Sequence, residues 1–316
     1  MKKLMILTLV ILIGCKTGND VPTSVEKIYT GTQGLAMNFL EKNQPTNIYE
    51  DSEFQVDISI ENKGTSDIEK GMVVINLEND YMKFDRWSSE FGDVDEMLPL
   101  DLKGRSYENP VGDSNIITAF LGALRFPESE KMSELHTSSM YFTACYDYKT
   151  QFFDTTCVDT DVYERKGAEK SCKISDKTFT DQGAPLAVTK IEPRMIASKD
   201  TGMIVPQYIV YFENKGDGEI LSIDAVQKAC SSSSLLNEDI NVVKINAYLS
   251  GKKLDCEPKE KEIAIVKLKD KQGKIRCTLK EGLDTTQGTY MTPLQITAEY
   301  GYTFTISKEI EIKRMI

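Results

Sequence analysis

The strongest constraint in this sequence is an internal repeat that divides most of the chain into two similar halves. Residues 35–41 match 186–192, the tetrapeptide Glu-Asn-Lys-Gly at 61–64 recurs at 213–216, and residues 143–148 match 297–302. The three matches keep their order, and their offset rises only from 151 to 154 residues. Ordered matches at nearly one spacing indicate duplication of one structural module.

Each half contains short segments in which apolar and polar residues alternate, as in strands that bury one face. Residues 54–60 alternate in this way and lead into Asn62-Lys63-Gly64, where glycine accepts a positive φ without steric cost. Residues 208–212 precede the second copy of this turn. No window shows a long apolar period of 3.6, so we expect few helices. Further strands are expected at 72–77, 116–124, 139–148 and 152–158 in the first half, and at 242–249, 262–268, 274–279, 294–300 and 303–312 in the second.

Many short strands separated by turns favour antiparallel sandwiches. A strand that ends in Glu-Asn-Lys-Gly, early in each module, resembles the Ig-like modules of exported archaeal and bacterial surface proteins. The CARDB-type cell-adhesion-related domains are the nearest group by this resemblance. It implies an all-β fold of two tandem Ig-like antiparallel β-sandwich domains that act as spacers or binding domains. We place the domains at 31–163 and 181–316, with a linker at 164–180.

The N-terminus has the parts of a secretory signal peptide. Lys2 and Lys3 precede the run 4–13, which is apolar except for Thr8. This run is too short for a permanent transmembrane helix, which needs about 20 apolar residues. Residues 12–15, Leu-Ile-Gly-Cys, resemble a lipobox, which implies cleavage after residue 14 and lipid on Cys15. An ordinary signal peptide with an incidental cysteine is the alternative. No second apolar run follows, so the C-terminus is expected to be free in solution.

The exported part of the chain is acidic. Removing residues 1–14 removes two lysines and no acid, so the formal net charge changes from −11 to −13. An acidic domain repels polyanions and anionic headgroups, which disfavours nucleic-acid binding. Residues 15–30 are polar and rich in turn-forming residues, so we expect a tether that holds the domains away from the membrane.

Seven cysteines are present, and six remain if Cys15 carries lipid. An even number suits three disulfides in an oxidising compartment. The repeat aligns Cys145 with Glu299 and Cys157 with Glu311, so both cysteines are missing together from the second copy. We therefore predict a Cys145–Cys157 bridge in a hairpin turning at 149–151, with Cys145 on the outer face. The other four allow three pairings, of which we favour Cys172–Cys230 and Cys256–Cys277.

Catalytic motifs are scarce. His136 is the one histidine, and its polar neighbourhood predicts an exposed loop position rather than a catalytic base. No phosphate-binding glycine loop, His-Glu-x-x-His motif or Cys-x-x-Cys pair occurs, so we predict no cofactor and no structural metal. Paired carboxylates could still support glycoside hydrolysis, but none of the 49 acidic residues stands out as such a pair.

Two weaker possibilities remain open at the level of sequence. Residues 93–96 (Asp-Val-Asp-Glu) and 159–161 (Asp-Thr-Asp) place oxygen donors suited to calcium in expected loops, although solvated acidic turns are the default interpretation. Trp87 belongs to an aromatic cluster that could stack on sugar rings, but packing inside a sandwich is the expected role.

Taken together, these features predict a non-catalytic cell-surface lipoprotein. It would be lipid-anchored outside the cytoplasm and act as a structural, adhesive or protein-binding module. Its partners would be the membrane, through the lipid, and a protein of the cell envelope, with no nucleic acid. The alternative is an extracytoplasmic carbohydrate-active hydrolase or carbohydrate-binding accessory protein that uses carboxylates.

Overall fold

The computed structural model describes residues 28–41, 45, 47–89, 92–94, 97–127, 133–163, 169–199, 202–231 and 233–315. Cys15 and the predicted signal peptide and tether up to residue 27 lie outside the described residues. The described chain is nearly all antiparallel β-structure, which confirms the predicted all-β sandwich fold. Within it, no helix has the length and apolarity needed to cross a membrane.

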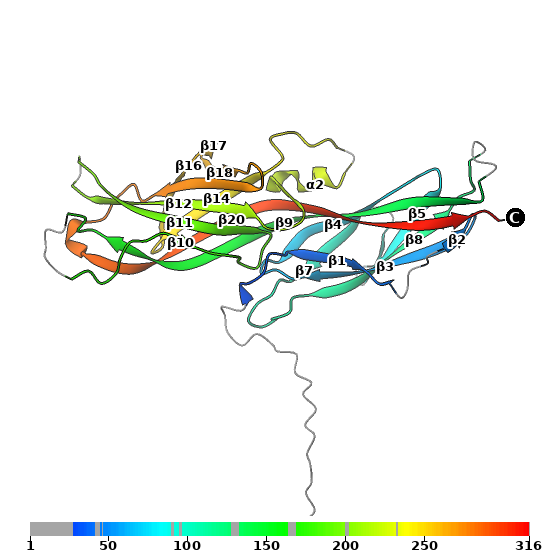
Figure 1. Ribbon diagram of the computed structural model, residues 1–316, viewed down its shortest axis with the longest axis horizontal. Helices are drawn as coiled ribbons and strands as arrows, with labels where there is room; N and C mark the ends of the chain where they lie inside the picture. The colour runs from blue at the N-terminus through cyan, green and yellow to red at the C-terminus, as the bar shows by residue number, and fades with distance from the viewer. Residues whose placement is uncertain are drawn as a thin grey trace, which may run out of the picture.

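Three sheets build two lobes (Figure 1). The sheet of lobe 1 has the strand order β1 (Leu35–Phe39), β3 (Glu53–Asn62), β8 (Ser114–Ala123), β5 (Met82–Ser89) and β6 (Gly92–Val94). The sheet of lobe 2 has the order β10 (Lys177–Thr178), β11 (Leu186–Ala197), β12 (Ile204–Asn214), β19 (Gln272–Thr278) and β16 (Asp255–Glu257).

A third sheet, the common sheet, packs against both of these. Its order is β17 (Lys259–Glu260), β18 (Ile263–Lys267), β14 (Val242–Leu249), β20 (Thr289–Lys313), β9 (Leu135–Asp159), β4 (Ile68–Leu77) and β7 (Leu98–Leu102). Three short strands add to it: β2 (Asn47–Tyr49) and β13 (Glu219–Leu221) beside β20, and β15 (Lys252–Lys253) beside β14. Helical segments within the described residues include η3 (Ile223–Ala225), α2 (Val226–Ala229) and η4 (Thr285–Gln287).

β9 and β20 belong to both lobes. They pair antiparallel without interruption from Leu135↔Lys313 to Asp159↔Thr289, and in Figure 1 they run side by side along the long axis of the molecule. The predicted hairpin at 149–151 is therefore wrong, and so is the predicted break between residues 300 and 303. Lys-Thr-Gln offers no residue suited to a tight turn, and Thr150 points inward, where its hydroxyl donates to the carbonyl of Leu186.

The repeat produces a local two-fold arrangement. Asp147 and Gly301 are equivalent by the repeat, 154 residues apart, and they lie directly opposite each other in the β9–β20 ladder. Residues 135–146 of β9 and 302–313 of β20 consequently belong to lobe 1, and their continuations belong to lobe 2. The two halves of the sequence form two lobes fused through one sheet.

The repeated motifs contact one another at this centre. Tyr148 Oη donates to Asn62 Oδ1 over 3.2 Å, and the equivalent Tyr302 Oη accepts from the Gly218 amide over 2.7 Å. Tyr146 Oη and Tyr300 Oη accept from the equivalent amides of Leu35 and Leu186. The short motifs that reveal the repeat therefore form the junction between the lobes.

The core of lobe 1 agrees with the sequence. Trp87 is fully buried and its ring packs against Phe142, at 6.0 Å between centroids. The inward face of β9 carries the residues expected there, Met140, Phe142, Ala144 and Tyr146, all fully buried. The packing role predicted for Trp87 is confirmed.

The disulfides correct two of the predicted pairs. The bridges are Cys145–Cys230, Cys157–Cys172 and Cys256–Cys277, so only the last was predicted. Cys145 and Cys157 lie 12 residues apart in one extended strand, a separation of roughly 40 Å, whereas a disulfide needs Cα atoms about 4–7 Å apart. Cys145 does lie on the outer face of β9, but α2 covers it and buries it completely.

Candidate functional site

His136 does not form a catalytic triad. It lies in β9 rather than in the predicted loop, stacked on the ring of Tyr81 at 3.5 Å, and its Nε2 lies 3.2 Å from Glu78 Oε2. The hydroxyl of Ser138 donates to the same carboxylate oxygen over 2.7 Å. A nucleophilic serine needs the histidine between itself and the acid, whereas here the acid lies between them. The bonds from Ser138 and His136 lower the pKa of Glu78.

Of the acidic segments proposed for calcium, residues 159–161 form bonds within the protein. Asp159 is buried, and its carboxylate binds Lys170 Nζ at 2.7 Å and the amide of Asp161 at 2.8 Å. Burial opposes its ionisation, but these bonds outweigh that effect and lower its pKa. Within the described part of the chain no three or more His, Cys, Asp or Glu side chains group as metal ligands. Asp95 and Glu96 lie outside the described residues.

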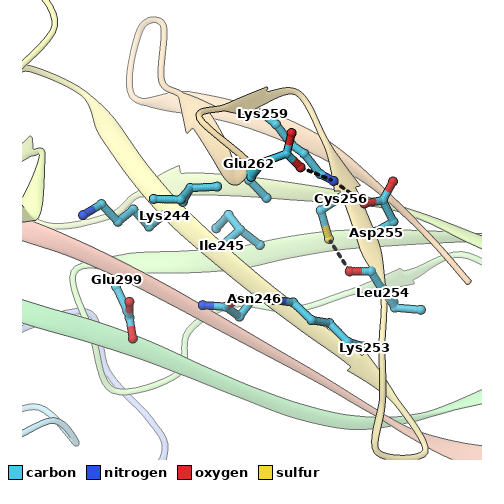
Figure 2. A pocket seen from close by; sticks show the side chains of 12 residues that line it. Lys244, Ile245, Asn246, Lys253, Leu254, Asp255, Cys256, Lys259, Glu262 and Glu299 are labelled. Carbon is cyan, nitrogen blue, oxygen red and sulfur yellow. Dashed lines mark hydrogen bonds and ion pairs between the residues drawn. The ribbon is translucent and has the colours of Figure 1, made fainter.

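A pocket of about 530 Å³ lies between β14 and the segment that carries β16 to β18 (Figure 2). Four of its charged residues pair with each other or with neighbours: Lys244, Asp255, Lys259 and Glu262. Lys259 and then Lys280 bind Asp255 and lower the pKa of its carboxyl group. Lys259 also lies 4.0 Å from Glu262. Because lysines and acids alternate around this pocket, it presents no field of one sign to a ligand.

A larger groove, of about 790 Å³, lies in lobe 1 between β1 and β20, and we call it the lobe 1 groove. Residues 32–38 line one wall and residues 302–306 the other, with residues 215–219 at the end nearest lobe 2. Phe304 and Ile306 are half-buried and pack against the core from this groove. The groove therefore combines apolar side chains with backbone from two strands.

Both strands that border the groove have an unpaired edge within the described residues. β1 is the last strand of its sheet and pairs only with β3. β20 pairs with β13 up to Thr303 and with β2 from Glu311, so over residues 304–310 its one described partner strand is β9. An unpaired strand edge offers amide and carbonyl groups to another extended chain.

The sequence does not reveal this groove. Alternation predicts a strand at 303–312, which is right, but it cannot show which edge of a strand lacks a neighbour. The one available signal was the repeat itself. It aligns Lys308 with Asp154 and Ile306 with Phe152, and so marks positions where the copies differ.

Comparisons with known proteins leave the chain without a family. No family model matches the sequence, and no curated protein matches it. The solved structures with some similarity include the secreted serine protease VesC from Vibrio cholerae, with 10% identity, a TM-score of 0.22, and coverage of 84% of this chain and 50% of that one. The chain thus spans half the length of that protease.

Two other similar structures are surface proteins by their names. The CupB6 tip adhesin from Pseudomonas aeruginosa has 7% identity and a TM-score of 0.21, with 89% of this chain and 98% of that chain covered. The B domain of a biofilm associated protein has 7% identity and a TM-score of 0.17, with 87% and 73% covered. All three TM-scores are below 0.5, so these similarities carry no argument about function.

Proposed function

We propose that this protein is a non-catalytic module of the cell surface, anchored by lipid on Cys15, that holds a protein-binding surface away from the membrane. The observation that carries the proposal is the uninterrupted pairing of β9 and β20 over 25 residues each. At about 3.3 Å per residue these strands are roughly 80 Å long, so they make one extended body from two sandwiches.

The disulfides support a location outside the cytoplasm, because such bonds persist in oxidising compartments. Cys145–Cys230 and Cys157–Cys172 both attach a segment to β9, the strand that the lobes share. The bridges therefore stiffen the spacer itself. Two candidate catalytic groups already have partners, because His136 contacts Glu78 and Asp159 pairs with Lys170.

The anchoring half of the proposal is tested by mass spectrometry of the native N-terminus and by fractionation of cells. We expect lipid on Cys15 and recovery in the membrane fraction, with Cys15→Ser moving the protein to the soluble fraction. An unmodified residue 15, or cleavage at another position, would contradict the anchor.

The binding half is tested by crosslinking on intact cells followed by identification of the neighbours. We expect one or a few envelope proteins to be captured reproducibly by the wild type. A protein that is reached by the crosslinker at the surface but captures no protein reproducibly would contradict the binding role.

A further inference from the structure

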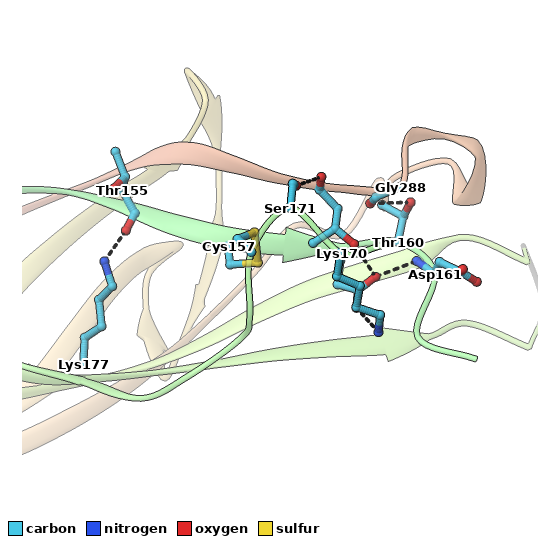
Figure 3. Close-up of a disulfide and its surroundings, with 11 residues drawn as sticks. Thr155, Cys157, Thr160, Asp161, Lys170, Ser171, Lys177 and Gly288 are labelled. Carbon is cyan, nitrogen blue, oxygen red and sulfur yellow. Dashed lines mark hydrogen bonds and ion pairs between the residues drawn. A yellow bond between two sulfur atoms is a disulfide. The ribbon is translucent and has the colours of Figure 1, made fainter. Parts of the chain in front are cut away.

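In lobe 2, the chain fills the equivalent of the lobe 1 groove with its own residues. β10 adds to the edge of β11 through the pair Lys177↔Ile191. Lys177 Nζ then reaches across to β9, where it binds Asp154 at 2.8 Å. It also donates to the carbonyl of Thr155 (Figure 3). The Cys157–Cys172 bridge fixes the preceding residues to the same strand. An inserted extended segment therefore closes this side of the sandwich.

The inserted segment also covers the apolar face of β9. The ring of Phe179 packs edge-on against Phe152, at 4.7 Å between centroids. Phe152 is 3% exposed and Thr150 is 1% exposed. Phe179 lies two residues after Lys177. The same extended segment therefore supplies the ammonium group that binds Asp154 and the ring that packs on Phe152.

Lobe 1 has no counterpart of β10 among the described residues. β11 corresponds to β1 by the repeat, and β1 is an edge strand. The positions of Thr150 and Phe152 are taken by Phe304 and Ile306, which are larger or equally apolar but only half-buried. At the place where β10 covers β9 in lobe 2, the described residues of lobe 1 thus present an apolar surface beside two unpaired strand edges.

The residue of lobe 1 that is equivalent to Asp154 carries the opposite charge. Lys308 takes the place of Asp154 and lies over the ring of Phe39 at 5.5 Å. No carboxylate of a described residue lies within ion-pairing distance of Lys308. A segment that binds here as β10 binds in lobe 2 would need an acidic residue where β10 has Lys177.

Tyr29, which precedes the groove wall at 32–38, lies against lobe 2 rather than in the groove. The ring of Tyr29 packs on Phe153, at 6.4 Å between centroids, and Phe153 lies in lobe 2 opposite Gln295. From Gln295 to Lys308 is 13 residues of strand, or roughly 43 Å. The repeat aligns Glu26 with Lys177, so the chain's own N-terminal segment is the occupant that the test has to distinguish.

We propose that the lobe 1 groove binds an extended segment of another protein by strand addition, with an acidic residue facing Lys308 and an apolar residue two positions later on Ile306. This deepens the proposed function, since it names the kind of partner that the surface module would hold. Backbone pairing supplies affinity in such complexes and alternate side chains supply specificity. The reversed charge makes the groove reject a copy of β10 itself.

The test uses two labelled peptides of residues 173–180, one with the natural sequence and one with Lys177→Glu. Fluorescence anisotropy measures their binding to the chain from Lys16 onward, as wild type and as Lys308→Glu. We expect the Lys177→Glu peptide to bind the wild type at least about tenfold more tightly than the natural peptide, and Lys308→Glu to reverse this preference. Asp154 of lobe 2 is unchanged in both proteins and serves as the internal reference.

Several outcomes would overturn the proposal. Failure of both peptides to bind, or binding that Lys308→Glu does not alter, would show that the groove accepts no such strand. A loss of thermal stability in Lys308→Glu that Glu26→Lys restores would show that the chain's own N-terminal segment is the occupant. If light scattering detects a dimer and the peptide dissociates it, a second copy of the chain is the occupant of the groove. If the peptides fail but surface crosslinking still captures a partner, only this inference fails and the proposed function stands.

Discussion

At the scale of the residue, the junction between the lobes depends on glycines that admit tyrosine hydroxyls. A Cβ added to Gly64 would lie 1.8 Å from Tyr148 Oη and 2.7 Å from the carbonyl oxygens of Gln33 and Gly183. The equivalent Cβ on Gly216 would lie 2.2 Å from Tyr302 Oη. The glycine of the Glu-Asn-Lys-Gly motif is therefore required for close packing rather than for a left-handed turn, since neither Gly64 nor Gly216 has a positive φ.

We predict that Gly64→Ala lowers the free energy of unfolding by about 1–3 kcal/mol, the usual range for an overpacked interior. Two of the contacting atoms are backbone and cannot rotate away. Gly122→Ala is the matched control, because its Cβ would meet only the flexible side chain of Lys83. Chemical denaturation of both variants checks this, and equal stability of the two would contradict it.

Asp147, at the two-fold centre, gives a prediction that depends on pH. Burial raises the pKa of its carboxyl group, and Asp224 adds to the rise while Lys70 opposes it. A raised folded-state pKa means that ionised Asp147 disfavours the folded state. Asp147→Asn should therefore increase stability at pH 7, and the gain should shrink as the pH falls toward 3.8, the ordinary value.

Asp255 supplies a comparison of opposite sign. Lys259 and Lys280 lower the pKa of Asp255. Its ionised carboxylate therefore stabilises the fold at pH values above its ordinary pKa, and this effect is lost as the pH falls through the pKa of the folded state. Asp255→Asn should reduce stability at pH 7, with the loss fading under acid conditions. Thermal melts between pH 2 and pH 7 check both variants, and shifts of the same sign at pH 7 would contradict this assignment.

At the scale of the element, the strands were largely predictable and their continuity was not. Alternation located residues on the inner face of β9 correctly, from Met140 to Tyr146. It also suggested two strands where one continues through 149–151, because three polar residues between two apolar runs look like a turn. The choice between a turn and a continued strand depends on the partner, and β20 lies 154 residues away in sequence.

The cysteine pairings failed for the same reason. Cys145 and Cys157 are absent together from the second copy, which predicted a bond between them. They do not bond to each other, because Cys145 bridges to Cys230 at the end of α2 and Cys157 to Cys172 before β10. The joint absence of two cysteines from one copy therefore does not identify the partner of either.

The disulfides should differ in their contribution to stability. The loops closed by Cys145–Cys230 and Cys256–Cys277 span 85 and 21 residues. In the chain-entropy model, loops of these lengths stabilise the folded state by about 4.6 and about 3.3 kcal/mol, respectively. We therefore predict that the Cys145→Ala/Cys230→Ala double variant has a lower Tm than Cys256→Ala/Cys277→Ala. The reverse order in calorimetry would contradict this ranking.

At the scale of the whole molecule, the two lobes form one body because they share β9 and β20. Neither half of the sequence contains a complete sandwich. Residues 28–163 include the stretch 148–159 of β9, whose inner face, at Phe152 and Val158, is buried in lobe 2. The repeat could reveal two copies, but it could not reveal that each copy lends a strand to the other.

This arrangement makes cooperative unfolding the central claim, and calorimetry of the chain from Lys16 onward tests it most directly. If the lobes share one core through β9 and β20, a single transition is expected, with equal calorimetric and van't Hoff enthalpies. Two separated transitions, each with the enthalpy of half the chain, would show that the lobes are independent domains and would contradict the account.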